Sequence, residues 1–250
     1  MAVTGPAELL ATWEAGLAQQ GGGRALLLHR AARPGAGTDA LLSVPLGERA
    51  ADLFALRRAL FGDRMQVKTD CADADCGAAM EFELDAGELG AARPRVPEGG
   101  LRVEEGEWVV HFRLPGPADL AAVSAAVDPG DARRMLGSRC ALSALRAGRA
   151  ASDGELARLP EPVLKRFAEV AEEADPAAEM TLNIACPECG AATPAELDIA
   201  AYLWTELDAW ARDVLLDVHL LASAYGWSEP EILALSPLRR RYYLELCADA

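Results

Sequence analysis

The sequence predicts an α+β fold, built from two copies of a helix–strand–knuckle–strand unit and a C-terminal segment of three helices. Three observations predict it. Two distant segments each carry a strand-like alternation into a pair of cysteines, and a stretch with helical spacing of apolar residues precedes each segment. The residues after the second segment show helical spacing and well-marked helix ends, without any strand pattern.

The first of these observations is an internal repeat. Residues 65–85 read MQVKTDCADADCGAAMEFELD, and residues 180–198 read MTLNIACPECGAATPAELD. Each copy begins with Met six residues before a Cys, follows its second Cys with Gly-Ala-Ala, and ends in Glu-Leu-Asp at the same offset. We therefore expect strands at 65–70, 80–85 and 180–185, with a tight cysteine loop, or knuckle, after the first strand of each copy.

The knuckles point to a metal site. The cysteines are Cys71 and Cys76 in the first copy, and Cys186 and Cys189 in the second. A glycine after each second cysteine, Gly77 or Gly190, permits the left-handed backbone that such a loop needs. One knuckle supplies two ligands and a closed structural zinc site needs four. The sequence thus predicts one structural Zn²⁺ per chain, bound by all four cysteines and joining the two copies.

The two knuckles are not equally typical of zinc sites. CPECG has the usual two residues between its cysteines, whereas CADADCG has four and adds Asp73 and Asp75 next to the thiolates. One alternative is therefore a metal-free site of buried thiols. A redox-active Cys-x-x-Cys is a further alternative, disfavoured because the βαβ context of a thioredoxin is missing.

The remaining elements follow from periodicity and from turn residues. We expect a helix at 7–19, a strand at 24–30, a loop at 31–39, a helix at 44–62, a Pro/Gly-rich connection at 86–100, a hairpin at 101–114 turning at Glu105-Gly106, and helices at 117–127, 131–148 and 160–174. The predicted parts are an N-terminal α+β part at 1–100, an insertion at 101–160, the second knuckle unit at 161–198 and the helical segment at 199–250.

The C-terminal segment has strong helix-end signals. A long helix is expected at 199–225, ending near Gly226. Ser228 and Glu231 form the pattern of a capping box for the next helix, and Trp227 and Ile232 occupy the two positions of a hydrophobic staple. Ser236-Pro237 predicts the start of a third helix, with the serine as N-cap and the proline at the first helical position.

Charge and motif content exclude several functions. The net charge of −15 disfavours nucleic acid and anionic membranes as partners. No secretory signal is found at the start and no apolar stretch is long enough to span a membrane, so we expect a cytoplasmic protein with reduced cysteines. No nucleophile elbow, Walker loop or zinc-protease motif is present, so neither enzymatic activity nor a small-molecule substrate is predicted.

Cys140 and Cys247 are expected to be buried free thiols, and His219 a packed core residue.

The run Arg239-Arg240-Arg241, followed by Tyr242, raises the alternative of a zinc-ribbon nucleic-acid-binding or transcription factor. Residues 198–250 contain nine acidic residues and four arginines, a net charge of −5, which is a poor electrostatic footprint for DNA. We therefore expect the arginines to form a solvated face or a surface for protein docking.

Residues 218–246, VHLLASAYGWSEPEILALSPLRRRYYLEL, resemble the C-terminal signature of the baseplate hub assembly chaperones of contractile-tailed phages, a family also found in phage-like contractile injection systems. Residues 44–65, the knuckle leading into MEFELD and residues 109–123 are similar to this family too. The resemblance covers most of residues 40–250. The chain departs from it at CADADC, where relatives are expected to have a shorter Cys-x-x-Cys, which bears on metal occupancy.

The resemblance implies a non-enzymatic factor that binds baseplate hub or spike proteins during assembly, in the cytoplasm of the producing bacterium. It also implies that the C-terminal motif includes partner-facing residues. Because Arg and Tyr are enriched in interface hot spots, the expected partner-binding residues are Arg239, Arg240, Arg241, Tyr242 and Tyr225. Trp227 and Ile232 are expected to be structural.

Overall fold

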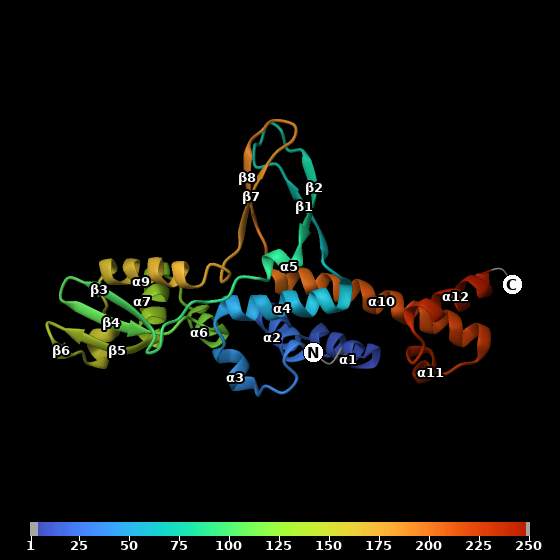
Figure 1. The fold of residues 1–250 in the computed structure, drawn as a ribbon, viewed down its shortest axis with the longest axis horizontal. Coiled ribbons are helices and arrows are strands. Elements are labelled where there is room, and N and C mark those ends of the chain that lie inside the picture. Colours follow the sequence, from blue (N-terminus) through green and yellow to red (C-terminus); the bar gives the residue numbers. More distant parts are fainter. Residues whose placement is uncertain (1–4, 249–250) are drawn as a thin grey trace. The chain divides into compact units, whose positions relative to one another are not determined.

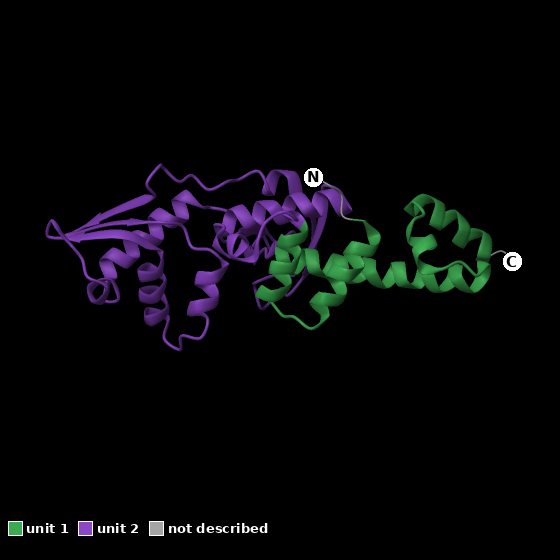
Figure 2. Ribbon diagram, turned by 90° about the horizontal axis from the view of Figure 1, so that it is seen from below, with its two compact units in different colours: residues 1–31, 200–250 green, residues 32–199 purple. Residues whose placement is uncertain are grey.

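A computed structural model describes residues 5–248 of the chain. The first four residues of the predicted N-terminal part, and the last two of the predicted C-terminal segment, lie outside the described residues. The chain divides into two compact units, residues 1–31 with 200–250 and residues 32–199 (Figure 2). The sequence was expected to form four consecutive parts, whereas this division has two units, one of which combines both ends of the chain.

The larger unit, residues 32–199, contains both helices and strands. Its helices are α3 (Thr38–Ser43), α4 (Leu46–Phe61), α5 (Ala86–Leu89), α6 (Pro117–Val123), α7 (Pro129–Cys140), α8 (Asp153–Leu156) and α9 (Glu161–Ala174). Its strands are β1 (Arg64–Asp70), β2 (Ala79–Asp85), β3 (Leu101–Glu105), β4 (Trp108–Phe112), β5 (Ala141–Arg146), β6 (Arg149–Ala150), β7 (Thr181–Ala185) and β8 (Ala192–Glu196).

The predicted repeat is present in this unit. Helix α4 leads into the antiparallel hairpin β1–β2, and helix α9 leads into the antiparallel hairpin β7–β8. The two hairpins project from the helices and their loops come together at the tip (Figure 1). With the C-terminal helices, this arrangement confirms the predicted α+β fold class.

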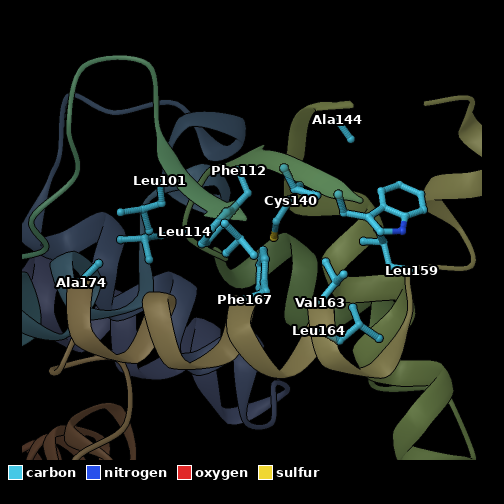
Figure 3. Packing of buried hydrophobic residues seen from close by; sticks show 13 residues of the cluster. Leu101, Phe112, Leu114, Cys140, Ala144, Leu159, Val163, Leu164, Phe167 and Ala174 are labelled. Atoms are coloured by element: carbon cyan, nitrogen blue, oxygen red, sulfur yellow. The ribbon is translucent and has the colours of Figure 1, made fainter. Parts of the chain in front are cut away.

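The main hydrophobic core of this unit lies between a four-stranded sheet and two helices. The sheet has the strand order β3-β4-β5-β6, and α9 and α7 pack against it (Figures 1 and 3). Helix α9 buries Val163, Leu164 and Phe167 at helical spacing. The ring of Phe167 packs on that of Phe112, with centroids 4.1 Å apart. Cys140 lies in this core without any exposure, and burial raises the pKa of its thiol to about 11, as expected of an inert structural cysteine.

A buried carboxylate also links the two repeated units. Asp175, which follows α9, accepts a hydrogen bond of 2.9 Å from the backbone N–H of Gly47 in the first turn of α4. A Cβ at Gly47 would lie 1.8 Å from the Asp175 Oδ1 atom, so the close approach requires glycine. Burial of the carboxyl raises the pKa of Asp175 above its ordinary value. The helices of the two copies are thus joined at their base, independently of the cysteines.

Two elements of the fold differ from the sequence predictions. The predicted strand 24–30 is helix α2 (Gly22–Ala32), because Ala25, Leu28, His29 and Ala32 are buried at helical spacing. The predicted helix 131–148 ends at Cys140 and continues as β5, which pairs with β4. Because strand formation depends on neighbouring strands more than on local propensity, the Ala- and Leu-rich residues 141–146 gave little local sign of it.

The smaller unit contains helices and connecting loops, and no strand, in its described residues. It contains α1 (Pro6–Leu17), α2, α10 (Ile199–Tyr225), α11 (Glu229–Leu233) and α12 (Pro237–Ala248). Trp13 of α1 donates a hydrogen bond of 2.7 Å from its indole to Asp208 of α10, and Gly16 leaves space for the ring of Trp204. Among the helices of residues 5–248, none is both long enough and apolar enough to span a membrane.

Candidate metal centre

The two hairpin loops have the same backbone design. The backbone N–H of Cys71 donates to the carbonyl of Ala78, and that of Cys186 donates to the carbonyl of Ala191, both at 2.9 Å. These bonds extend the ladders of β1–β2 and β7–β8 by one residue pair. Each loop therefore begins at a first cysteine that is fixed by its own hairpin.

The second cysteines are positioned by turns that use the predicted glycines. Gly77 has a φ of 54° and Gly190 a φ of 77°, the left-handed conformation expected from the sequence. The longer first loop is closed by Asp73, whose carbonyl accepts from the N–H groups of Cys76 and Gly77. The Asp73 carboxylate also accepts a hydrogen bond of 3.0 Å from the backbone of Asp75. These local turns take up the two extra residues of the first loop, so both of its sulfurs still face the second knuckle.

The four predicted cysteine ligands come together. Their sulfur atoms all lie within 4.8 Å of one another, and two of the separations cross between the hairpins: 3.6 Å for Cys71–Cys189 and 3.8 Å for Cys76–Cys186. Four sulfurs at about 2.3 Å from a central zinc would be about 3.8 Å apart in a regular tetrahedron. All four are free thiols, because their sulfur–sulfur distances are well beyond the bond length of about 2.05 Å in a disulfide. The set could therefore hold a metal ion.

The cysteines also form most of the core between the hairpins. The buried residues are Cys71, Met80 and Cys186, and few apolar side chains pack around them. Between the buried Met65 and the cysteines, strand β1 alternates between exposed and partly buried side chains, and β7 does so throughout. A two-stranded hairpin is at best marginally stable alone in water. Apolar contacts at the tip are therefore few, and the cysteine cluster forms most of the contact between the two hairpins there.

Thr193 is a member of the site that the sequence interpretation missed. It is 2% exposed, and its Oγ1 accepts a hydrogen bond of 3.1 Å from the backbone N–H of Ala72 in the other hairpin. The same oxygen lies 4.0 Å from the sulfur of Cys71. In the repeat, Thr193 occupies the position of Met80, four residues after the second cysteine. The replacement of an inward apolar residue by a hydroxyl was the signal that could have revealed it.

The electrostatics of the thiols favour a cation at their centre. The backbone N–H groups of Cys189 and Glu188 point at the sulfur of Cys186 and lower the pKa of its thiol to about 7. For Cys189, a backbone hydrogen bond from Ala191 acts in the same direction, but burial and the three neighbouring sulfurs raise the pKa to about 12. One thiolate is therefore accessible near neutral pH, whereas several close together need a positive charge to offset their repulsion.

The second set of predicted residues, in the C-terminal segment, divides between the surface and the interior. Arg239 and Arg241 are exposed, Tyr242 is 60% exposed and Tyr225 is 38% exposed. Arg240 is only 4% exposed, so the expectation that it lies on the surface with its neighbours is wrong. The guanidinium of Arg240 lies near the carboxylate of Asp217 in α10. Successive residues of a helix point in different directions, so Arg240 is turned inward while Arg239 and Arg241 face solvent.

The predicted helix ends of this segment are present. The carboxylate of Glu231 accepts hydrogen bonds from the backbone N–H and the hydroxyl of Ser228, at 2.8 and 2.6 Å. Ile232 is fully buried. Trp227 stacks on Tyr225 with centroids 4.7 Å apart and meets Tyr243 edge-on at 4.9 Å. Its ring therefore joins the end of α10 to α12, in addition to its position before the capping box.

Two further sequence expectations are corrected in this segment. His219, expected in the core, is exposed on α10, because Val214 and Leu221 mark the buried face of that helix. Cys247, expected to be buried, is partly exposed near the end of α12.

Comparison of the chain with protein-family models, with curated proteins and with solved structures found no match.

Proposed function

We propose that the chain is a non-enzymatic assembly factor for the baseplate hub of a contractile phage tail or a phage-like injection system. It binds hub or spike proteins through its C-terminal helices and is stabilised by one structural zinc ion. The observation that carries the zinc part of the proposal is the convergence of four cysteine sulfurs from two hairpins more than a hundred residues apart. The assembly role is supported by the resemblance of residues 218–246 to the hub assembly chaperones.

Zinc is the metal that best suits this set of ligands. Four thiolates in a tetrahedral arrangement select zinc or an iron–sulfur centre, and two short knuckles facing each other are typical of zinc. A site with four protein ligands has no open position for a substrate, which favours a structural role. The ion would replace the apolar core that the hairpins lack, so that its binding free energy stabilises the fold.

The C-terminal helices offer a surface suited to protein binding. Tyr242 and the two exposed arginines are residue types enriched in interface hot spots. Because Arg240 is buried, this surface has only two exposed arginines, whereas the whole chain has a net charge of −15. This composition supports a protein partner more than nucleic acid, whose affinity rests on many phosphate contacts.

Co-expression with the hub and spike proteins of a contractile tail tests the assembly role. We expect the chain to co-purify with one of them and Tyr242→Ala with Arg239→Ala to reduce the yield of complex, whereas Leu145→Ser, on an exposed strand of the other unit, leaves it unchanged. A complex unaffected by the double variant would remove the C-terminal surface from the proposal. Absence of any complex would overturn the assembly role.

Retention on heparin tests the alternative of a nucleic-acid-binding factor. The proposal predicts elution at low salt, because the chain carries a net charge of −15. Strong retention that falls steeply with salt, and that is abolished by Arg239→Glu with Arg241→Glu, would favour the alternative.

A further inference from the structure

Helix α12 presents a stripe of large apolar side chains to solvent. Leu238 is 65% exposed, and Tyr242 and Leu246 are each 60% exposed. Their spacing of four residues places them one above the other on a single face of the helix. Isolated exposed leucines are common, but an aligned set of this length on one helix is typical of a binding surface.

The stripe is held on a fixed support. The opposite face of α12 carries Arg240, which is buried, and Tyr243, whose ring packs on Trp227. The hydroxyl of Tyr225 also donates a hydrogen bond of 3.4 Å to the backbone carbonyl of Tyr243. A surface that is already ordered loses little conformational entropy on binding, which favours affinity.

Positive charge flanks the stripe. Arg239 and Arg241 are exposed on either side of Tyr242. Within residues 5–248, Arg239 has no ion pair through its side chain, and Arg241 has Glu245 of the same helix at 3.1 Å. That pair is largely exposed, and exposed pairs of this kind contribute little. Both guanidinium groups are therefore available to carboxylates of another molecule.

We propose that this surface, defined by Leu238, Tyr242, Leu246, Arg239 and Arg241, binds an amphipathic helix of the partner protein whose apolar stripe is flanked by acidic side chains. The inference rests on the proposed function and specifies the partner chemistry at the same site. Apolar side chains spaced by four residues match the ridges of a second helix, and the flanking arginines fix its charge pattern. The recognition is thus by apolar contact, with acidic residues selecting the orientation and the partner.

A second copy of the chain is the competing occupant. Helix α10 also exposes Leu216 and Leu220, on the side of Asp213, and this face could meet α12 of another molecule. The charge of each copy disfavours it, because two chains that each carry a net charge of −15 repel one another.

Two synthetic helical peptides test the inference with the full-length protein. Each has about 18 residues, or five helical turns, with leucines at every third and fourth position; one has glutamates and the other lysines beside the leucines. We expect the glutamate peptide to bind about tenfold more tightly in fluorescence anisotropy at about 0.15 M salt, where the long-range field of the net charge of −15 is screened and the two close charge pairs remain. Equal affinity for both peptides, or binding of neither, would overturn the inference.

Matched variants locate the binding. Arg239→Glu with Arg241→Glu is expected to reverse the preference between the peptides, whereas Arg166→Glu, an exposed arginine of α9, should leave it unchanged. Leu238→Ser with Leu246→Ser is expected to abolish binding of both peptides, and Leu145→Ser to have no effect. Because all these side chains are exposed, the variants should fold, which circular dichroism checks.

Sedimentation velocity decides between the two occupants. The inference predicts a protein whose sedimentation coefficient does not change with concentration. Association that Leu238→Ser with Leu246→Ser abolishes would overturn it in favour of a second copy. Failure of the peptides alongside intact co-purification with hub or spike proteins would reject this surface while leaving the proposed function standing.

Discussion

The two β-structures of the larger unit are stabilised in different ways. The four-stranded sheet β3–β6 packs on α9 and α7 through a core of large apolar side chains, including Phe112 and Phe167. The paired hairpins β1–β2 and β7–β8 have a core of three buried residues, two of which are cysteines. We therefore expect the sheet to fold by hydrophobic burial and the hairpins to depend on a metal ion held by their thiols. Variants in each structure separate these two modes of stabilisation.

The largest effect is expected from Cys186→Ser. Loss of one thiolate should remove the metal, whose apparent binding free energy in zinc-binding domains is about 10–16 kcal/mol. The hairpins should then open while the sheet stays folded. Hydrogen exchange should show loss of protection at residues 64–85 and 181–196, with protection kept at 108–112.

Cys247→Ser is the matched control for this variant, because Cys247 is a free thiol outside the cluster. It should keep one metal ion per chain. Loss of metal from Cys247→Ser, or unchanged protection of the hairpins in Cys186→Ser, would contradict the assignment of the cluster.

The converse change is Phe167→Ala in the core of the sheet. Removal of a buried aromatic ring is expected to destabilise the sheet by about 3–5 kcal/mol. Metal content should be unchanged. The ring of Phe167 packs on Phe112 in the core of the sheet, and the cysteines belong to a separate cluster. Thermal unfolding and metal analysis on one sample measure both quantities. Concurrent loss of zinc would mean that the two structures fold as one.

A buried carboxylate paired with two half-exposed arginines makes the stability of the part around the sheet depend on pH. Arg113 and Arg139 contact the carboxylate of Asp119, which is 1% exposed. Burial raises the pKa of Asp119, but the hydrogen bonds from Arg113 and the backbone of Gly116, together with both positive charges, lower it overall. The stabilisation is present above the ordinary Asp pKa and is lost as the pH falls through the lower, folded value.

Asp119→Asn is expected to destabilise the protein by about 1–2 kcal/mol at neutral pH, because the hydrogen bonds to the buried carboxylate lose their charge while the two half-exposed arginines stay solvated. The difference in stability between wild type and variant should shrink as the pH is lowered below about 4. Chemical unfolding of both proteins from pH 3 to 7 measures it. A difference that is independent of pH would show that the carboxylate charge does not stabilise the fold.

The smallest effect is expected from Thr193→Val, which removes the hydroxyl between the hairpins and keeps the shape of the side chain. The lost hydrogen bond to Ala72 should destabilise the tip by about 1 kcal/mol. Zinc should transfer to a chromogenic chelator faster than from wild type, since groups around metal ligands hold them in place. The exposed Thr181→Val is the control, and equal transfer rates for the two variants would exclude a role for the hydroxyl.

The sequence was most informative where a local pattern repeats. The matched offsets around Cys71 and Cys186 located both hairpins and brought together the four candidate ligands, because the constraints act within a few residues. It was least informative where long-range packing decides. The burial of Arg240 depends on its place opposite α10, and strand β5 exists because β4 is beside it. Neither neighbour can be read from the adjacent residues.

The helix α2 belongs to a different class of error. The three consecutive leucines of RALLLHR resemble a buried strand, but Ala25, Leu28 and Ala32 have helical spacing, and Ala, Leu and Arg are good helix formers. Here the sequence contained the correct signal, and the length of the apolar run was given too much weight. Thr193 is similar, because its departure from the repeat marked it in advance.

The proposed zinc ion joins the two repeated units, and X-ray absorption at the zinc edge of the purified protein tests for it most directly. One zinc per chain with four sulfur ligands at about 2.3 Å is the expected result. Protein that is folded without stoichiometric metal, or zinc bound by nitrogen and oxygen, would contradict it.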